Sequence, residues 1–136
     1  MNCKCLRLVQ NIFNISFHFV FSFIASLCGS LRVKLKNEAL TQQSYWQGSY
    51  QFSLTVNGRP SWTSKSRAIW YVPQFKDYRI GHLKDIGATR GGITASENDE
   101  VADPQHIMYW KYHKDGDGWV SPTEESDIIV ECIDGM

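Results

Sequence analysis

The sequence lacks an excess of charge of either sign, known catalytic motifs and any long helical pattern. Its 136 residues include 14 basic and 14 acidic side chains, so the formal net charge is zero. A neutral chain gives no electrostatic reason to expect nucleic acid or an acidic membrane surface as a partner. The motifs G-x-S-x-G, H-E-x-x-H and the P-loop are absent. We therefore expect a non-catalytic protein, with an enzyme of unrecognised class as one alternative.

The chain also lacks an internal repeat and any linker rich in Gly, Ser or Pro. Its length suits one domain rather than two. The aromatic residues are segregated: five of the seven Phe lie between Phe13 and Phe23, whereas all Trp and Tyr lie from Tyr45 onward. The two parts of the chain are therefore suited to different solvents.

The N-terminal part has the features of a secretion signal. Lys4 and Arg7 form a short basic start, and no charged residue occurs in residues 8–31. Residues 12–27 are mostly apolar, and small residues follow them, as in signal peptides. We assign residues 1–28 to a signal peptide and expect a secreted protein that is free of the membrane after cleavage. An uncleaved anchor is the alternative, although a spanning helix needs roughly 20 mainly apolar residues and polar residues interrupt this shorter run.

The position of cleavage decides which of the four cysteines remain. Three small or compact residues offer a cleavage site: Ser26, Cys28 and Ser30. Cleavage after Ser26 leaves Cys28 and Cys132, which can form one bridge from the first strand to the last. Cleavage after Cys28 leaves Cys132 alone, either buried or free to pair with another chain.

Residues 31–134 are predicted to form a single β domain. Short segments rich in β-branched and aromatic residues alternate with turn signals, as in small all-β proteins. Strands are expected over residues 31–36, 50–56, 61–63, 68–72, 78–82, 107–113, 119–120 and 127–133. The fold class is therefore all-β, with an antiparallel sheet arranged as a meander, a sandwich or a partly open barrel, preceded by the signal segment.

The clearest local signal is a β-hairpin around Asn57-Gly58. Apolar residues alternate with polar ones in the preceding segment, which is the period of a half-buried strand: Tyr50, Phe52, Leu54 and Val56. Asn-Gly accepts positive φ at both central positions of a type I′ turn. We therefore expect a tight hairpin with positive φ at Gly58.

Several short motifs follow one another in a distinctive order. They are Gly48-x-Tyr50, Val56-Asn57-Gly58-Arg59-Pro60-x-Trp62, Ile69-Trp70-Tyr71, Ile80-Gly81, Trp110-x-Tyr112, Trp119 and Asp127-Ile128-x-Val130-x-Cys132. Together they resemble a small β module of secreted and receptor-type multidomain proteins, chiefly of invertebrates. The resemblance covers residues 31–132. The module has no assigned activity, so the resemblance implies an extracellular location and a recognition role.

Residues 113–124 (HKDGDGWVSPTE) match much of the EF-hand calcium loop. In that alternative the module depends on calcium, and the ligands are Asp115, Asp117, Ser121 and Glu124. His113 stands at the first ligand position, where a hard cation prefers oxygen, and the flanking residues favour strands. We therefore expect no metal or other cofactor here, but a hairpin turn between strands 107–113 and 127–133.

The aromatic residues allow two interpretations. Large rings can fill the core of a small β domain, or an exposed aromatic strip can bind a protein or a carbohydrate. The candidate binding residues are Trp62, Trp70, Tyr71 and Trp110. The sequence thus predicts an extracellular, non-catalytic binding or structural module whose ligand is a protein or a carbohydrate.

Overall fold

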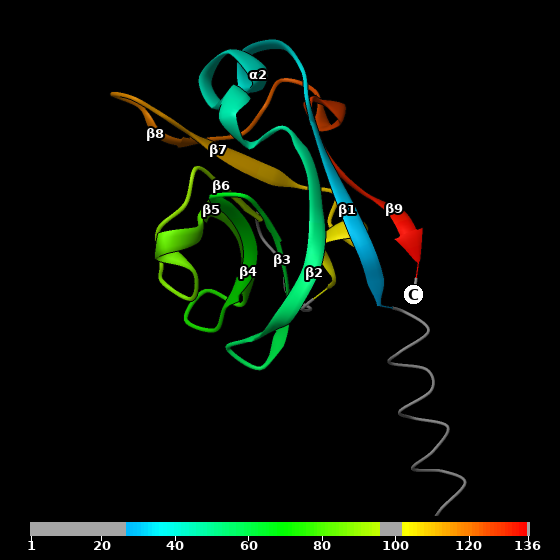
Figure 1. Ribbon diagram of the computed structural model, residues 1–136. Helices are drawn as coiled ribbons and strands as arrows, with labels where there is room; N and C mark the ends of the chain where they lie inside the picture. Colours follow the sequence, from blue (N-terminus) through cyan, green and yellow to red (C-terminus); the bar gives the residue numbers. More distant parts are fainter. Residues whose placement is uncertain (1–26, 96–101, 136) are drawn as a thin grey trace, which may run out of the picture.

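The computed structural model describes residues 27–95 and 102–135, and most of these residues lie in β-strands (Figure 1). The strands are β1 (Cys28–Leu35), β2 (Gly48–Val56), β3 (Arg59–Ser64), β4 (Arg67–Val72), β5 (Asp77–His82), β6 (Ile93–Ala95), β7 (Trp110–Lys114), β8 (Gly118–Val120) and β9 (Ile128–Gly135). The helical segments are α2 (Asn37–Gln43) and the short 3-10 helices η1 (Ser44–Trp46), η2 (Leu83–Asp85), η3 (Pro104–His106) and η4 (Glu125–Asp127). The predicted all-β class is confirmed. The predicted signal lies outside the described residues, except for its last two positions.

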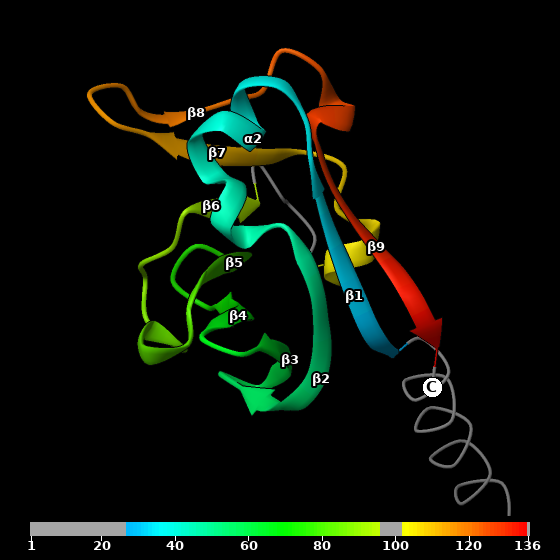
Figure 2. The same ribbon diagram turned by 45° about the horizontal axis from the view of Figure 1, so that its top comes forward.

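All nine strands of the described chain belong to one antiparallel sheet that curls into a half-barrel (Figures 1 and 2). Strands β1 to β8 follow one another as a meander, and β9 returns to pair with β1 at the other edge. Helix α2 lies beside β7 and closes part of the gap between the two ends of the sheet. The Lys114 ammonium on β7 lies 2.6 Å from the Glu38 carboxylate on α2, which adds an exposed ion pair to this contact.

The main core lies on the concave face of the sheet, and a smaller buried cluster of Ala68, Trp70 and Val72 lies on the opposite face. One row of directly opposed residues crosses seven strands: Phe52, Trp62, Ile69, Ile80, Ile93, Tyr112 and Val120. Trp62, Ile69, Ile80 and Ile93 are completely buried. Because opposed side chains on one face of an antiparallel pair contact each other, this row joins the strands into one apolar layer.

The predicted hairpin is confirmed. Asn57 has φ +55° and Gly58 has φ +83°, as a type I′ turn requires. The expected burial of Leu54 is wrong, because this side chain is 59% exposed. The pairing of β2 with β3 shifts between Phe52 and Thr55, and such a bulge reverses the alternation of faces.

The first and last strands are joined by a disulfide between Cys28 and Cys132, with a Cα–Cα distance of 5.8 Å. Cys28 is buried in the core and lies within β1. The predicted boundary at residues 28 to 31 is therefore too late, since removal of residues 1–28 would delete both the first residue of the sheet and the bridge. The first described strand begins at Cys28 and the last ends at Gly135.

No helix in residues 27–95 and 102–135 has the length and apolar character needed to cross a membrane.

The predicted hairpin between residues 107–113 and 127–133 is wrong. Strand β7 pairs with β8 through a shorter turn, in which the Asp117 amide donates to the Lys114 carbonyl (3.0 Å) and Gly116 and Gly118 adopt positive φ. Strand β9 pairs instead with β1. The glycines allow the chain to reverse early, and the apolar residues of β9 then match those of β1 across the other edge.

Candidate binding site

Three of the four predicted binding residues belong to the core. Trp62 and Trp70 are completely buried, and Trp110 is 2% exposed. The indole N–H of Trp62 donates to the Cys28 carbonyl (2.7 Å), so the polar group of this ring has its hydrogen-bond partner inside the protein. The prediction that these rings form an exposed strip is therefore wrong: Trp62 and Trp110 fill the main core, whereas Trp70 is buried in a second cluster with Ala68 and Val72.

Tyr71, the fourth candidate, is half-buried. Its ring packs against Tyr78, with ring centroids 5.7 Å apart, and the Arg59 guanidinium lies 5.2 Å from its centre. Tyr71 is thus held by its neighbours and is not brought together with Trp62, Trp70 and Trp110 on one accessible surface.

The proposed calcium ligands are not gathered around one point. The side chain of Asp115 is fully exposed and that of Asp117 is more than half exposed. Glu124 is the N-cap of η4, where its side chain accepts a hydrogen bond from the Asp127 amide. The elements on either side of Asp115 and Asp117 are strands rather than the helices of an EF-hand. In the part of the chain that the structure describes, no three His, Cys, Asp or Glu side chains are placed to hold a metal ion.

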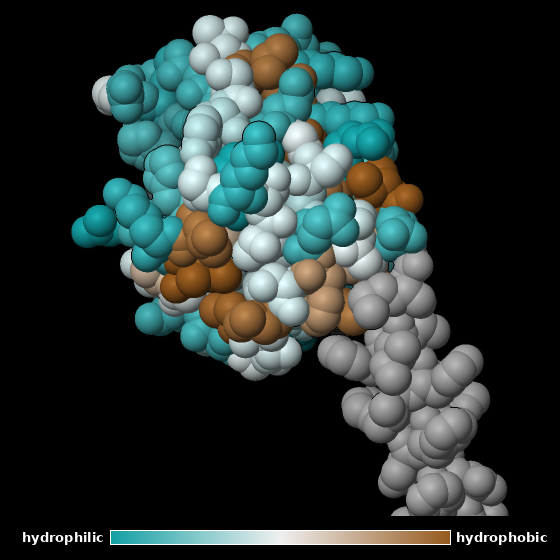
Figure 3. Space-filling view, in the orientation of Figure 1, coloured by the Kyte–Doolittle hydropathy of each residue, from teal (hydrophilic) through white to brown (hydrophobic). Residues whose placement is uncertain are grey.

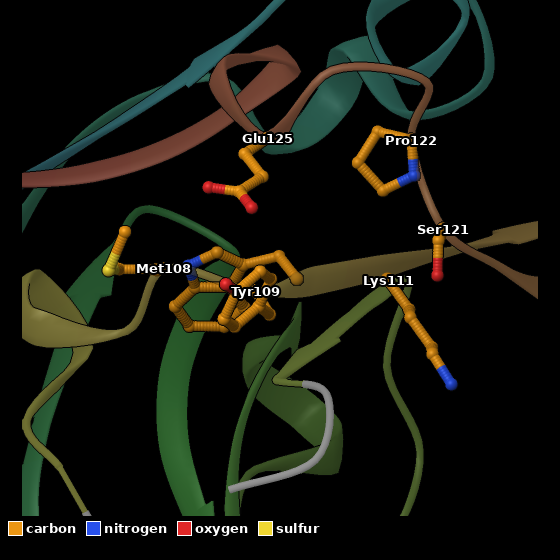
Figure 4. Close-up of a pocket in the computed structure, with 7 residues that line it drawn as sticks. Met108, Tyr109, Lys111, Ser121, Pro122 and Glu125 are labelled. Atoms are coloured by element: carbon orange, nitrogen blue, oxygen red, sulfur yellow. The ribbon is translucent and has the colours of Figure 1, made fainter.

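A surface pocket of about 270 Å³ lies beside the beginning of β7 (Figure 4). Its walls come from the segment leading into β7 and from the segment between β8 and η4. The lining residues are Met108, Tyr109, Trp110, Lys111, Ser121, Pro122 and Glu125. We define these seven residues as the β7 pocket.

The pocket exists because β7 and β8 separate there. Their pairing ends at Tyr112 and Val120, and the same register would place Pro122 opposite Trp110. Proline has no N–H to donate to a ladder, and the chain leaves the sheet at this point to form η4. The Trp110 indole donates to the Ile107 carbonyl (3.1 Å), which fixes the opposite wall.

Helix η4 is held firmly although it is only three residues long. Glu124 and Asp127 form a reciprocal capping box, which satisfies amides that would otherwise lack partners. The Asp127 carboxylate also accepts a hydrogen bond from the Asn37 side chain (2.8 Å), and its carbonyl accepts one from the Lys36 amide (2.8 Å). Glu125 is therefore presented at the pocket from a rigid support.

The pocket combines exposed apolar side chains with two opposite charges. Met108 is 63% exposed and Tyr109 is 54% exposed. In Figure 4 the Glu125 carboxylate points towards the side of Met108 and Tyr109, whereas the Lys111 side chain extends in another direction. Within residues 27–95 and 102–135, neither Lys111 nor Glu125 forms an ion pair with another side chain. The pocket thus offers an aromatic ring, a thioether, a cation and an anion to a ligand.

Elsewhere the apolar surface is divided. On the face seen in Figure 3, hydrophobic residues form small patches separated by polar ones. Isolated exposed apolar residues are normal on proteins. The grouping of Met108 and Tyr109 with unpaired charges around a hollow is what distinguishes the β7 pocket.

Few features of the sequence indicated this site. Met108 and Tyr109 lie in an apolar segment that predicts a strand, and Glu125 is one of several neighbouring acidic residues. Pro122 was the available signal, because a proline after a short strand indicates that pairing stops there.

Comparison of the chain with models of protein families, with curated proteins and with solved structures finds no match.

Proposed function

We propose that this chain is an extracellular, non-catalytic binding module that holds a protein or carbohydrate ligand at the β7 pocket. The Cys28–Cys132 bridge supports the location, because disulfides persist mainly in oxidising compartments. The uncharged, apolar N-terminal segment and the resemblance to an invertebrate extracellular module agree with it.

The observation that carries the binding role is the exposure of Met108 and Tyr109 beside the unpaired charges of Lys111 and Glu125. None of these exposed groups is needed to fill the core or to satisfy a buried partner. Tyr and Met are enriched at protein interfaces, and aromatic side chains placed beside charges are typical of recognition sites. A binding role explains why the chain keeps such side chains at a hollow.

Secretion is tested by expressing the full sequence in cultured animal cells and sequencing the N-terminus of the product. We expect protein in the medium whose first residue is no later than Cys28, since β1 and the disulfide need that residue. A product that begins at Met1 in the cytosol would contradict the extracellular location.

Binding is tested with the secreted protein on arrays of extracellular proteins and of glycans. We expect at least one ligand whose signal is lost in Tyr109→Ala and kept in Leu54→Ala. Leu54 is a matched control because it is also more than half exposed but lies on β2. Binding that survives Tyr109→Ala and Glu125→Gln, or no binding on either array, would contradict the proposed function.

A further inference from the structure

We propose that the ligand of the β7 pocket is an extended segment of a partner protein that carries a basic residue and adds to the start of β7 at Trp110, on the side where β8 has ended. This inference rests on the proposed function, and it chooses a protein rather than a carbohydrate. Two independent features support it: the direction of the backbone groups of Trp110, and the side chains around them.

The backbone argument begins at His113. Its amide donates to the Gly92 carbonyl (2.9 Å), so the backbone polar groups of His113 face β6. In an antiparallel strand these groups alternate in direction from one residue to the next. The N–H and C=O of Tyr112 and Trp110 therefore face the β8 side.

At Tyr112 these groups meet β8, where Val120 is the partner. At Trp110 no described residue continues the ladder, because β8 has ended and Pro122 leads the chain away to η4. The N–H and C=O of Trp110 thus face the β7 pocket with no strand of residues 27–95 and 102–135 beside them. Unpaired strand groups are the usual site of strand addition by an extended peptide.

The side chains specify the charge of the segment. The Glu125 carboxylate points towards the Tyr109 side of the pocket (Figure 4) and has no cationic partner among the described residues. A Lys or Arg side chain there pairs with Glu125 and places its cation against the Tyr109 ring. Lys111 favours an acidic or neutral residue at another position of the same segment.

Met108 favours a protein over a carbohydrate. It is the most exposed of the large apolar side chains in residues 27–95 and 102–135. A flexible thioether adapts to the aliphatic part of different side chains, and it is common on surfaces that bind peptides. A sugar ring would use Tyr109 but would leave Met108 and the free backbone groups of Trp110 unused.

The test uses the secreted protein and a bead library of hexapeptides that are N-acetylated and C-amidated, with one residue fixed in each pool. We expect pools with fixed Arg or Lys to retain at least tenfold more protein than pools with fixed Glu. Glu125→Gln should reduce this preference at least fivefold. Asp115→Asn, which removes an exposed carboxylate at the turn between β7 and β8, should leave the preference unchanged.

Strand addition has its own signature. In the best peptide, N-methylation of single backbone amides should weaken binding at least tenfold at alternate positions only, because only every second amide faces β7. Equal effects at all positions, no preference for basic residues, or an unchanged preference in Glu125→Gln would overturn the inference. Glycan binding that depends on Tyr109, with no peptide retained, would overturn it and leave the proposed function standing. The absence of both would contradict both.

Discussion

The two edges of the sheet differ in how far their strands are paired, buried and cross-linked. At the closed edge, formed by β1 and β9, β1 is paired on both sides, Leu31 and Val33 are completely buried and a disulfide joins the strands. At the open edge, formed by β7 and β8, pairing stops after three residue pairs and the β7 pocket follows. Met108 and Tyr109 are more than half exposed there.

The difference separates two tasks within one small sheet. Packing, cross-linking and the Arg32 and Lys34 ion pairs with Glu131 lie at the closed edge. At the open edge, exposed apolar side chains and charged groups are accessible to a ligand. We therefore expect substitutions at the closed edge and in the core beneath it to change stability, and substitutions at the open edge to change binding.

The largest effect should come from the ring that supports the closed edge. Trp62→Ala removes a completely buried indole and its hydrogen bond to Cys28, so the free energy of unfolding should fall by about 3–5 kcal/mol. The matched control is Trp119→Ala at the open edge, where the ring is 39% exposed. Urea denaturation measures both, and equal losses would remove the proposed contrast.

Loss of the disulfide should come next. The bridge spans 104 residues of sequence, and removing such a cross-link typically costs about 2–4 kcal/mol. In urea denaturation, Cys28→Ser with Cys132→Ser should lower the free energy of unfolding by that amount. Binding at the β7 pocket should stay intact in the folded protein. An unchanged midpoint would show that the closed edge does not depend on the bridge.

A smaller effect is expected between the two edges, at the β2–β3 turn. Gly58→Val places a β-branched residue at φ +83° and should destabilise the protein by more than about 1 kcal/mol. Gly58→Asn is the control, because Asn tolerates positive φ. Similar melting temperatures for the two variants would argue against this strain.

Alkaline pH offers a further test of the core. Burial raises the pKa of Tyr50 above its usual value near 10, and burial has the same effect on Tyr78. The folded protein therefore keeps phenol protons that the unfolded chain releases, so stability should be full below pH 10 and fall as the pH rises above it.

Tyr50→Phe removes a hydrogen bond to the Trp46 carbonyl (2.6 Å) and should cost about 1 kcal/mol at pH 7. Between pH 10 and pH 11 the urea midpoint of Tyr50→Phe should fall less steeply than that of the parent protein, because this variant lacks one of the buried phenols. If the urea midpoint of Tyr50→Phe fell with pH as steeply as that of the parent protein, the Tyr50 phenol would not be a source of the pH dependence.

The smallest effect concerns calcium at the open edge. Glu124 caps η4, and Gln keeps an oxygen that can accept the same hydrogen bond. Glu124→Gln should therefore change stability by less than about 0.5 kcal/mol, with calcium or with chelator. A bound ion at a hundredfold excess over Kd would add about 2.7 kcal/mol. A micromolar calcium affinity that Glu124→Gln abolishes would instead favour a calcium-dependent module.

Much of the fold was predictable where local signals and burial agree. The alternation of Leu31, Val33 and Leu35 predicted β1, and Asn57-Gly58 predicted the hairpin turn. The pairing of β9 with β1 was indicated only by the possible bridge between Cys28 and Cys132, because the choice between two distant strands depends on which edge remains free. The helix α2 was also missed, since seven residues give too short a pattern.

The site was far less predictable than the fold. Sequence composition cannot distinguish a buried Trp62 from an exposed Tyr109, since both are large and aromatic. The pocket depends on where β7 and β8 separate, which is set by the register of their pairing and by Pro122. Glu125 becomes a candidate binding residue only once the structure shows that no cation of the described residues pairs with it.

The most direct test of the account maps a bound peptide onto the protein. In a 15N-labelled sample titrated with the best hexapeptide, we expect the largest chemical shift changes at the amides of Trp110, Lys111 and Glu125. The Trp110 amide should also become protected from hydrogen exchange, because it gains a strand partner. Changes centred on Arg32 and Glu131 at the closed edge, with Trp110 unaffected, would contradict the account.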